Sequence, residues 1–244
     1  MARIFVTGSA DGLGRATAAT LLANGHEIVV HARSASRRSA LQDLADRGAH
    51  TVVGDLGDGG QVRELAEQIN AIGPMHAVIH NAGVYTGPEI AAVNILAPYL
   101  LTALIDRPRR LVYLTSGMHQ GGRARVPDLG ARASVSYSDS KLFVTALALA
   151  VARLWPDVCS NAVDPGWVPT RMGGPKAPDD LREGHRTQEW LAAGDDPLAL
   201  TSGGYWFHKA RREPHPAASD PSFQEALLDE LAAVTGVSLP ADRL

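Results

Sequence analysis

The sequence has a single cysteine, few aromatic residues and no long apolar run. Because Cys159 stands alone among 244 residues, the chain cannot form an intramolecular disulfide or a thiolate metal site. The nine histidines include no H-E-x-x-H pattern or comparable cluster, so we expect no bound metal. The longest apolar stretch, Val144–Val151, is far shorter than the roughly 20 residues of a membrane-spanning helix. We therefore expect no membrane span.

Neither sign of charge is in large excess. The 23 basic and 26 acidic residues leave a net charge of −3, so no strong field attracts the whole protein to nucleic acid or to an anionic membrane. Small molecules are the expected partners. A strand pattern begins within three residues of the first methionine, which leaves no room for a signal peptide and predicts a cytoplasmic protein. The length fits one domain, residues 1–244.

Short apolar runs alternate with longer amphipathic segments along the chain. Seven runs are predicted to be strands: Arg3–Thr7, Glu27–Val30, Thr51–Val53, Ala77–His80, Leu111–Thr115, Ser160–Val163 and Tyr205–His208. The segments between them are predicted to be helices: Leu13–Ala23, Ser36–Arg47, Gln61–Ile72, Glu89–Ile105, Ser136–Leu154 and Thr187–Ala193. Alternation of this kind predicts an α/β fold, a doubly wound parallel sheet of about seven strands with helices on both faces.

Two segments near the C-terminus have distinct signals. Residues 169–186 are rich in Gly, Pro and charge, so they are predicted to form a loop too long for a simple connector. Together with the short helix that follows, residues 169–195 are expected to act as a substrate lid. A final helix is predicted from Asp220, as cap, and Pro221, at the first turn, to Gly236.

A glycine-rich turn, Thr7-Gly8-Ser9-Ala10-Asp11-Gly12-Leu13-Gly14, joins the first strand to the first helix. Glycines at positions 8, 12 and 14 permit a tight turn, close approach of a pyrophosphate and close packing of helix on strand. The helix N-terminus adds N–H groups and the positive end of a dipole. A glycine turn alone is weak evidence, but its place after the first strand favours dinucleotide binding.

The second strand is followed by Arg33, where an NAD site usually has a carboxylate for the ribose 2′-hydroxyl. A forked guanidinium suits a 2′-phosphate instead. With Arg15, Arg37 and Arg38 nearby, NADP(H) is favoured over NAD(H). Arg37 and Arg38 can equally be the solvated start of a helix.

Tyr137 and Lys141 form a Y-x-x-x-K pair at the start of a predicted helix. Residues four apart share one helical face, so an ammonium group can lie beside the phenol and stabilise its phenolate form. Such a pair often occurs by chance, and on many helices both side chains are simply exposed to solvent and have no catalytic role. Here it follows the fifth strand and Ser116, an order that favours acid–base chemistry.

The motifs T-G-x-x-x-G-x-G, Asp55-Leu56, Asn81-Ala82-Gly83, Asn94, Ser116, Y-x-x-x-K and Asp164-Pro165-Gly166 occur in this order. Over nearly the whole chain this series resembles the short-chain dehydrogenase/reductase family, and S-G-G-Y-W-F with the C-terminal helix resembles its retinol-dehydrogenase-like branch. The resemblance implies a Rossmann fold and a nicotinamide-dependent ketone or aldehyde reductase, or an alcohol dehydrogenase.

The resemblance also implies roles for individual residues. Tyr137 is the general acid, Lys141 lowers its pKa and binds the nicotinamide ribose, Ser116 binds the substrate oxygen, and Asn94 holds a proton-relaying water. Many members carry the serine nearer to the tyrosine, at the position of Ala124 here. The residues expected at the cofactor are Gly8, Ser9, Asp11, Gly12, Leu13, Gly14, Arg33, Asp55, Leu56, Asn81, Ala82, Gly83, Tyr137, Lys141, Pro165, Gly166, Val168 and Thr170.

Residues next to these motifs are candidates for the substrate pocket: Tyr85, Met118, His119, Val135, Trp167 and Met172. A pocket built from them is largely apolar, which favours a lipophilic ketone, aldehyde or alcohol; ordinary packing explains any single one equally well. The alternative function is a non-catalytic NADP(H)-binding sensor or structural protein, because a fold alone does not fix function. A longer-chain epimerase or dehydratase is disfavoured by the spacing of the glycine turn.

The segment Asn81–Asn94 is short compared with the family pattern, in which this interval is about twice as long. The missing part is expected to remove a loop and the first turns of the helix Glu89–Ile105, far from the chemistry. In many relatives this helix pairs with the tyrosine-bearing helix across a dimer interface. We therefore expect a complete catalytic site and a homo-oligomer that is weakened or altered.

Overall fold

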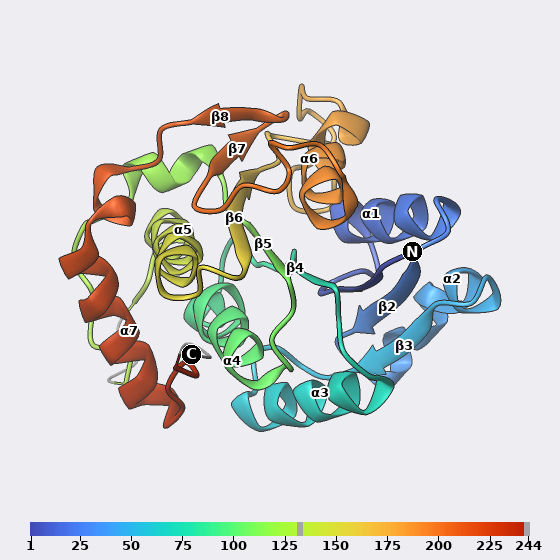
Figure 1. The fold of residues 1–244 in the computed structure, drawn as a ribbon, viewed down its shortest axis with the longest axis horizontal. Coiled ribbons are helices and arrows are strands. Elements are labelled where there is room, and N and C mark those ends of the chain that lie inside the picture. The colour runs from blue at the N-terminus through green and yellow to red at the C-terminus, as the bar shows by residue number, and fades with distance from the viewer. Residues whose placement is uncertain (131–133, 242–244) are drawn as a thin grey trace.

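The computed structural model describes residues 1–130 and 134–241 and contains one eight-stranded sheet (Figure 1). The strand order is β3-β2-β1-β4-β5-β6-β7-β8. The strands are β1 (Arg3–Val6), β2 (Glu27–Ala32), β3 (His50–Val53), β4 (Ala77–His80), β5 (Arg110–Leu114), β6 (Cys159–Asp164), β7 (Tyr205–Phe207) and β8 (Ala210–Arg212). All neighbours pair in parallel except β7 and β8. The predicted doubly wound fold is confirmed, with the switch in strand order between β1 and β4.

Strand β8 was not predicted from the sequence. It pairs with β7 in an antiparallel hairpin whose two-residue turn is His208-Lys209, with φ of 48° and 63°. Turns of this kind usually use Asn-Gly or Asp-Gly because both central residues need positive φ. Neither the turn residues nor the exposed, polar sequence of β8 gives the usual hairpin signal.

Helices cover both faces of the sheet, and α1 and α6 lie on the opposite side from α3, α4 and α5 (Figure 1). The α-helices are α1 (Gly12–Ala23), α2 (Gln42–Asp46), α3 (Gly59–Ile72), α4 (Ala97–Leu104), α5 (Tyr137–Leu154), α6 (Leu181–Ala193) and α7 (Pro221–Thr235). Side chains alternate along β1, so Phe5 packs in one core while Ile4 and Val6 pack in the other. Among the described helices, none combines the length and apolar character needed to cross a membrane.

Three predicted helix boundaries differ from the structure. The expected helix Ser36–Arg47 is a 3₁₀ helix, η1 (Ala35–Leu41), followed by α2. The expected helix Glu89–Ile105 contains a π-helical turn, η2 (Ala92–Leu96), ahead of α4. Helix α6 begins at Leu181, so the predicted loop 169–186 is too long by its last six positions.

The early start of α6 has a local cause. Asp180 caps the helix by accepting hydrogen bonds from the N–H groups of Arg182 and Glu183. The buried face of the helix carries polar groups, including Gln188, which donates to the hydroxyl of Thr17. A polar buried face gives no apolar period, which is why the sequence pattern indicated a loop there.

The C-terminal segment encloses α5. Helix α7 packs on α5, and the tail beyond it accepts hydrogen bonds from two core aromatic residues: Tyr99 donates to the carbonyl of Val237 (2.7 Å) and Trp155 to that of Pro240 (3.0 Å). All residues of α5 from Asp139 to Val151 are buried. The helix that carries the predicted Tyr–Lys pair is therefore held on every side by its own chain.

Candidate active site

A cavity of about 790 Å³ lies at the carboxyl ends of the central strands. Its walls come from the glycine turn after β1, the ends of β2 and β3, the turn after β4, the first turns of α5 and the loop after β6. This is where doubly wound sheets bind ligands, beside the switch in strand order. The volume is within the usual range for a cofactor or small-molecule site.

The glycine turn provides a cradle against the start of α1. Gly8 and Gly12 have φ of 63° and 55°, a region that favours glycine. A Cβ on Gly14 would lie 2.6 Å from the carbonyl oxygen of Gly8, so the close approach excludes a side chain. In the described chain the N-cap residue Asp11 makes no side-chain capping bond. The first-turn N–H groups of α1 therefore have no competing cap, as an anion site requires.

His31 holds the glycine turn in place, a role that the sequence analysis missed. The Gly8 N–H donates to Nδ1 of His31 (3.0 Å), and Nε2 lies 2.7 Å from the carbonyl oxygen of Gly54. These two bonds require a neutral ring with its proton on Nε2, and burial lowers the pKa of His31 in the same direction. Its position directly after the predicted strand Glu27–Val30 was the available signal.

Of the four arginines near the second strand, Arg38 is exposed and lies off the cavity wall, and the other three differ in their surroundings. Arg33 is exposed and lies on the cavity wall, and no acidic side chain within the described chain pairs with it. Arg37 also reaches the cavity, where it pairs with Asp11 at 3.2 Å. The guanidinium of Arg15 donates to both carboxylate oxygens of Asp43, each at 2.7 Å. Arg33 is therefore the arginine best placed to meet an anionic group in the cavity.

Tyr137 lies on the cavity wall, and the hydroxyl of Ser116, which does not line the cavity itself, lies close to the Tyr137 hydroxyl. Ser116 follows β5, and Tyr137 is the first residue of α5. Burial raises the pKa of Tyr137 to about 12, while the hydrogen bond from Ser116 acts in the opposite direction. The phenol is thus protonated at neutral pH and accepts a hydrogen bond that stabilises its ionised form.

Lys141 lies one turn along α5 and is buried beside the tyrosine. Its Nζ donates to the carbonyl oxygen of Leu114 (2.8 Å) and lies 5.5 Å from the centroid of the Tyr137 ring. Burial lowers the pKa of Lys141 to about 8, and the carboxylate of Asp164 opposes this shift. Asp164 is itself held by the N–H of Gly166 (3.0 Å) and the hydroxyl of Tyr205 (3.1 Å).

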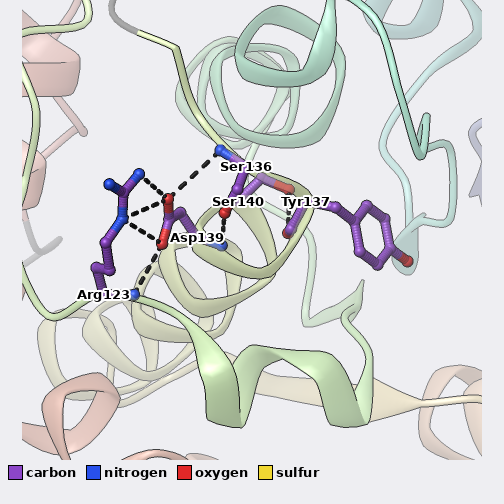
Figure 2. A network of polar contacts seen from close by, with 5 residues as sticks. All are labelled: Arg123, Ser136, Tyr137, Asp139 and Ser140. Atoms are coloured by element: carbon purple, nitrogen blue, oxygen red, sulfur yellow. Dashed lines mark hydrogen bonds and ion pairs between the residues drawn. The ribbon is translucent and has the colours of Figure 1, made fainter.

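The first turn of α5 is fixed by a network of polar contacts (Figure 2). Ser136 and Asp139 form a capping box, and Arg123 binds the Asp139 carboxylate through its backbone N–H (2.7 Å) and its guanidinium (2.6 Å). Burial alone would raise the pKa of Asp139, but these hydrogen bonds lower it to about 2. Figure 2 shows the ring of Tyr137 pointing away from this network, which anchors its backbone and does not involve its hydroxyl.

Asn94 lies in the π-helical turn and makes three hydrogen bonds with its side chain. Its oxygen accepts from the N–H of Val84 (2.8 Å), and its nitrogen donates to the Val84 carbonyl (2.9 Å) and to the Ser140 hydroxyl (2.9 Å). Asn94 thus ties the shortened segment after β4 to the first turn of α5. Its expected part in a proton relay stays a prediction.

The cavity brings together most of the predicted cofactor residues. On its walls lie Gly8, Asp11, Gly12, Leu13, Arg33, Asp55, Leu56, Asn81, Ala82, Gly83, Tyr137, Lys141, Pro165 and Thr170. Four other predicted cofactor residues do not line the cavity: Ser9, Gly14, Gly166 and Val168. Ser9 is buried and hydrogen-bonds Val6 and His31, so it supports the turn. Wall residues that the sequence analysis did not name include Arg171 and Gln61.

Exposed apolar side chains lie in three segments that follow strands of the site; Met172 is on the cavity wall and Tyr85 lies against Tyr137. In the described chain, Tyr85, Met118, Trp167 and Met172 are each 45–58% exposed and come from the segments after β4, β5 and β6. His119, in contrast, is buried: its Nδ1 bonds the carbonyl of Ser116 (2.7 Å), and its Nε2 accepts from a backbone N–H. It positions Ser116 and does not form a free pocket wall. No group of three potential metal ligands is found among the described residues.

Comparison with known proteins agrees with this arrangement. A family model described as short chain dehydrogenase matches residues 2–98. An uncharacterized oxidoreductase of Emericella nidulans is 37% identical over 98% of this chain and 99% of its own length. The short-chain dehydrogenase chyC of Penicillium rubens is 35% identical over 99% of this chain and 100% of its own. The chain belongs to the short-chain dehydrogenase family.

Solved structures share the fold at lower identity. A blue fluorescent protein from a metagenomic library, in complex with NADPH, superposes with a TM-score of 0.68 at 23% identity, covering 84% of this chain and 95% of its own. At this identity the likeness shows the fold alone.

Proposed function

We propose that the protein is an NADP(H)-dependent oxidoreductase that interconverts a lipophilic ketone or aldehyde and the corresponding alcohol. The observation that carries the proposal is that Tyr137 and buried Lys141 line the same cavity as the glycine turn, with the Ser116 hydroxyl close to that of Tyr137. A binding site alone has no need for an acid, a partner that holds the reacting oxygen and a cation next to the acid. Together they form a proton-transfer site.

The residues present fit a dinucleotide. The close approach of Gly14 to Gly8 and the uncapped N-terminus of α1 suit a pyrophosphate, and exposed Arg33 suits a 2′-phosphate, which favours NADP(H). The NADPH complex of the fold relative cited above is consistent with this choice. When bound, the nicotinamide cofactor supplies or accepts the hydride.

The side chains of the site then donate or accept the proton. In the reducing direction, Ser116 and Tyr137 both donate hydrogen bonds to the carbonyl oxygen of the substrate, and the Tyr137 proton passes to that oxygen as negative charge develops. Lys141 stabilises the resulting phenolate, because its ammonium group lies close to the ring in a buried setting. In the oxidising direction Tyr137 takes the proton from the alcohol.

The substrate class follows from the apolar side chains at and next to the site. Met172 lines the cavity, Tyr85 lies against Tyr137, and Met118 and Trp167 are further exposed apolar side chains in the segments next to Ser116 and Pro165. Burial of such side chains against a ligand is worth about 25 cal/mol per Å² of apolar surface. A lipophilic carbonyl compound or alcohol gains from these contacts, whereas a charged or sugar-like substrate does not.

The decisive experiment measures loss of NADPH absorbance with a panel of ketones and aldehydes, with wild type and Tyr137→Phe compared at equal concentration. We expect turnover by the wild type and a loss of about 100-fold or more in Tyr137→Phe, with NADPH binding unchanged. The alternative, a non-catalytic NADP(H)-binding sensor or structural protein, is favoured if the wild type binds NADPH tightly and turns over none of the panel. Equal turnover by both proteins would refute the role of Tyr137.

A further inference from the structure

We propose that Arg171 binds the pyrophosphate of the dinucleotide together with the N-terminus of α1. The inference rests on the proposed dinucleotide binding and adds a residue that no motif of the sequence pointed to. It also limits the expected lid, residues 169–195, to the turn that carries Arg171, because α6 occupies Leu181–Ala193 and packs on α1 and the sheet.

The loop after β6 closes on itself at its base. The carboxylate of Asp179 accepts from the N–H of Trp167 (2.6 Å), and the N–H of Asp179 donates to the Trp167 carbonyl (3.1 Å). Within the loop, Thr170 accepts from the N–H groups of Gly173 (3.1 Å, through its hydroxyl) and Gly174 (2.8 Å, through its carbonyl). Arg171 therefore lies in an ordered turn with a defined position.

This turn contacts the start of α1. The methyl group of Thr170 is 3.4 Å from the position that a Cβ on Gly12 would occupy. Arg171, the next residue, is exposed and lies on the cavity wall with Gly12 and Leu13. Arg171 is thus a wall residue next to the turn that contacts the N-terminus of α1, where the anionic centre of the cofactor is expected.

The charges around this part of the cavity leave Arg171 available. A helix N-terminus supplies about half a positive charge, which does not balance the two negative charges of a pyrophosphate. Lys141 directs its Nζ to a backbone carbonyl, and Asp11 is paired with Arg37. Among the described side chains no carboxylate pairs with Arg171. A guanidinium fork matches two phosphate oxygens.

The test measures dissociation constants for NADPH and NADH by cofactor fluorescence for the wild type, Arg171→Ala and Arg171→Gln. Because the pyrophosphate is common to both cofactors, we expect both variants to weaken NADPH and NADH binding by the same factor, about tenfold. Lys176→Ala is the matched control: Lys176 is exposed in the same loop but lies off the cavity wall, and its loss should change neither constant.

Three results separate this inference from the proposed function. A wild type that binds neither dinucleotide refutes the proposed function itself. Unchanged constants in folded Arg171→Gln and Arg171→Ala refute the inference alone, as does an equal loss in Lys176→Ala. A loss confined to NADPH also overturns it, because the contact would then be with the 2′-phosphate. Far-ultraviolet circular dichroism of each variant checks that it is folded.

Discussion

The ring of Tyr85 lies against the ring of Tyr137, with centroids 4.7 Å apart and planes inclined by 57°. Tyr85 follows Val84, whose N–H and C=O are both bonded to the side chain of Asn94. The shortened segment after β4 thus places an aromatic side chain against Tyr137, the proposed acid. A substrate bound at the Tyr137 hydroxyl is therefore expected to lie near this ring.

We expect Tyr85 to select flat, ring-bearing carbonyl compounds over aliphatic ones of equal size. Replacing Tyr85 with Ala should lower kcat/KM for an aryl ketone by about tenfold, since an aromatic pair contributes about 0.5–1.5 kcal/mol beyond area burial, and should change it little for an aliphatic ketone. Tyr85→Phe keeps the ring and should retain the preference. An equal loss for both substrates in Tyr85→Ala would indicate a general structural role instead.

Arg33 is expected to set the preference for NADP(H). Removing a charged hydrogen-bond partner of a phosphate costs about 1.5–3 kcal/mol, so Arg33→Ala should raise the dissociation constant for NADPH by about 10- to 100-fold and leave that for NADH unchanged. The control is Arg38→Ala, an exposed arginine of the same segment that lies off the cavity wall. Wild-type protein that binds both cofactors equally well would contradict this assignment.

Asp164 is expected to set the alkaline limit of activity through Lys141. Burial lowers the pKa of Lys141 to about 8, and the Asp164 carboxylate keeps it from falling further. The ammonium form predominates below that pH, so reduction should be retained below about pH 8 and decline as the pH rises through this value. In Asp164→Asn the pKa of Lys141 falls, and the decline should begin at lower pH.

The pH profile of kcat separates this effect from a structural one. Tyr205→Phe removes one hydrogen bond to Asp164 but keeps its charge, so its alkaline limit should stay near that of the wild type. His119 and Tyr137 also lie within the electrostatic influence of Asp164. An alkaline limit that does not move in Asp164→Asn would show that another group controls it.

The ion pair between Arg123 and Asp139 should be visible in acid stability. The pKa of Asp139 is lowered from 3.8 to about 2 in the folded chain, so its contribution to stability is present above about pH 4 and is lost as the pH falls toward 2. Arg123→Ala removes this contribution, so its acid unfolding midpoint should lie at higher pH than that of the wild type. Arg125→Ala, an exposed arginine two residues away, should not shift the midpoint.

The sequence predicted the parallel sheet and the Tyr–Lys pair because both depend on local patterns. Buried parallel strands are continuous apolar runs, and residues four apart must share a helical face. The parts that were not predicted depend on contacts between distant segments. His31 acts by joining Gly8 to Gly54, and α6 buries a polar face on α1. Contacts of this kind leave no periodic pattern in the local sequence from which they could be predicted.

Assembly in solution is expected to be weakened or altered by the shortened segment after β4. Helix α7 packs on α5, and the buried part of α4 extends from Ala97 to Ala103. Size-exclusion chromatography with light scattering should therefore give a mass that falls toward that of a single chain, about 25.8 kDa, as the protein is diluted. A tight dimer or tetramer would show that the shortened segment leaves the family interface intact.

The tail that crosses α4 and α5 has a further consequence for how the protein behaves at low concentration. Tyr99 and Trp155 are bonded to Val237 and Pro240 of the same chain, so the contacts that hold the tyrosine-bearing helix are intramolecular. Such contacts form at a fixed effective concentration. Turnover per molecule should therefore stay constant on dilution, where an enzyme that needed a second subunit to support this helix would lose activity.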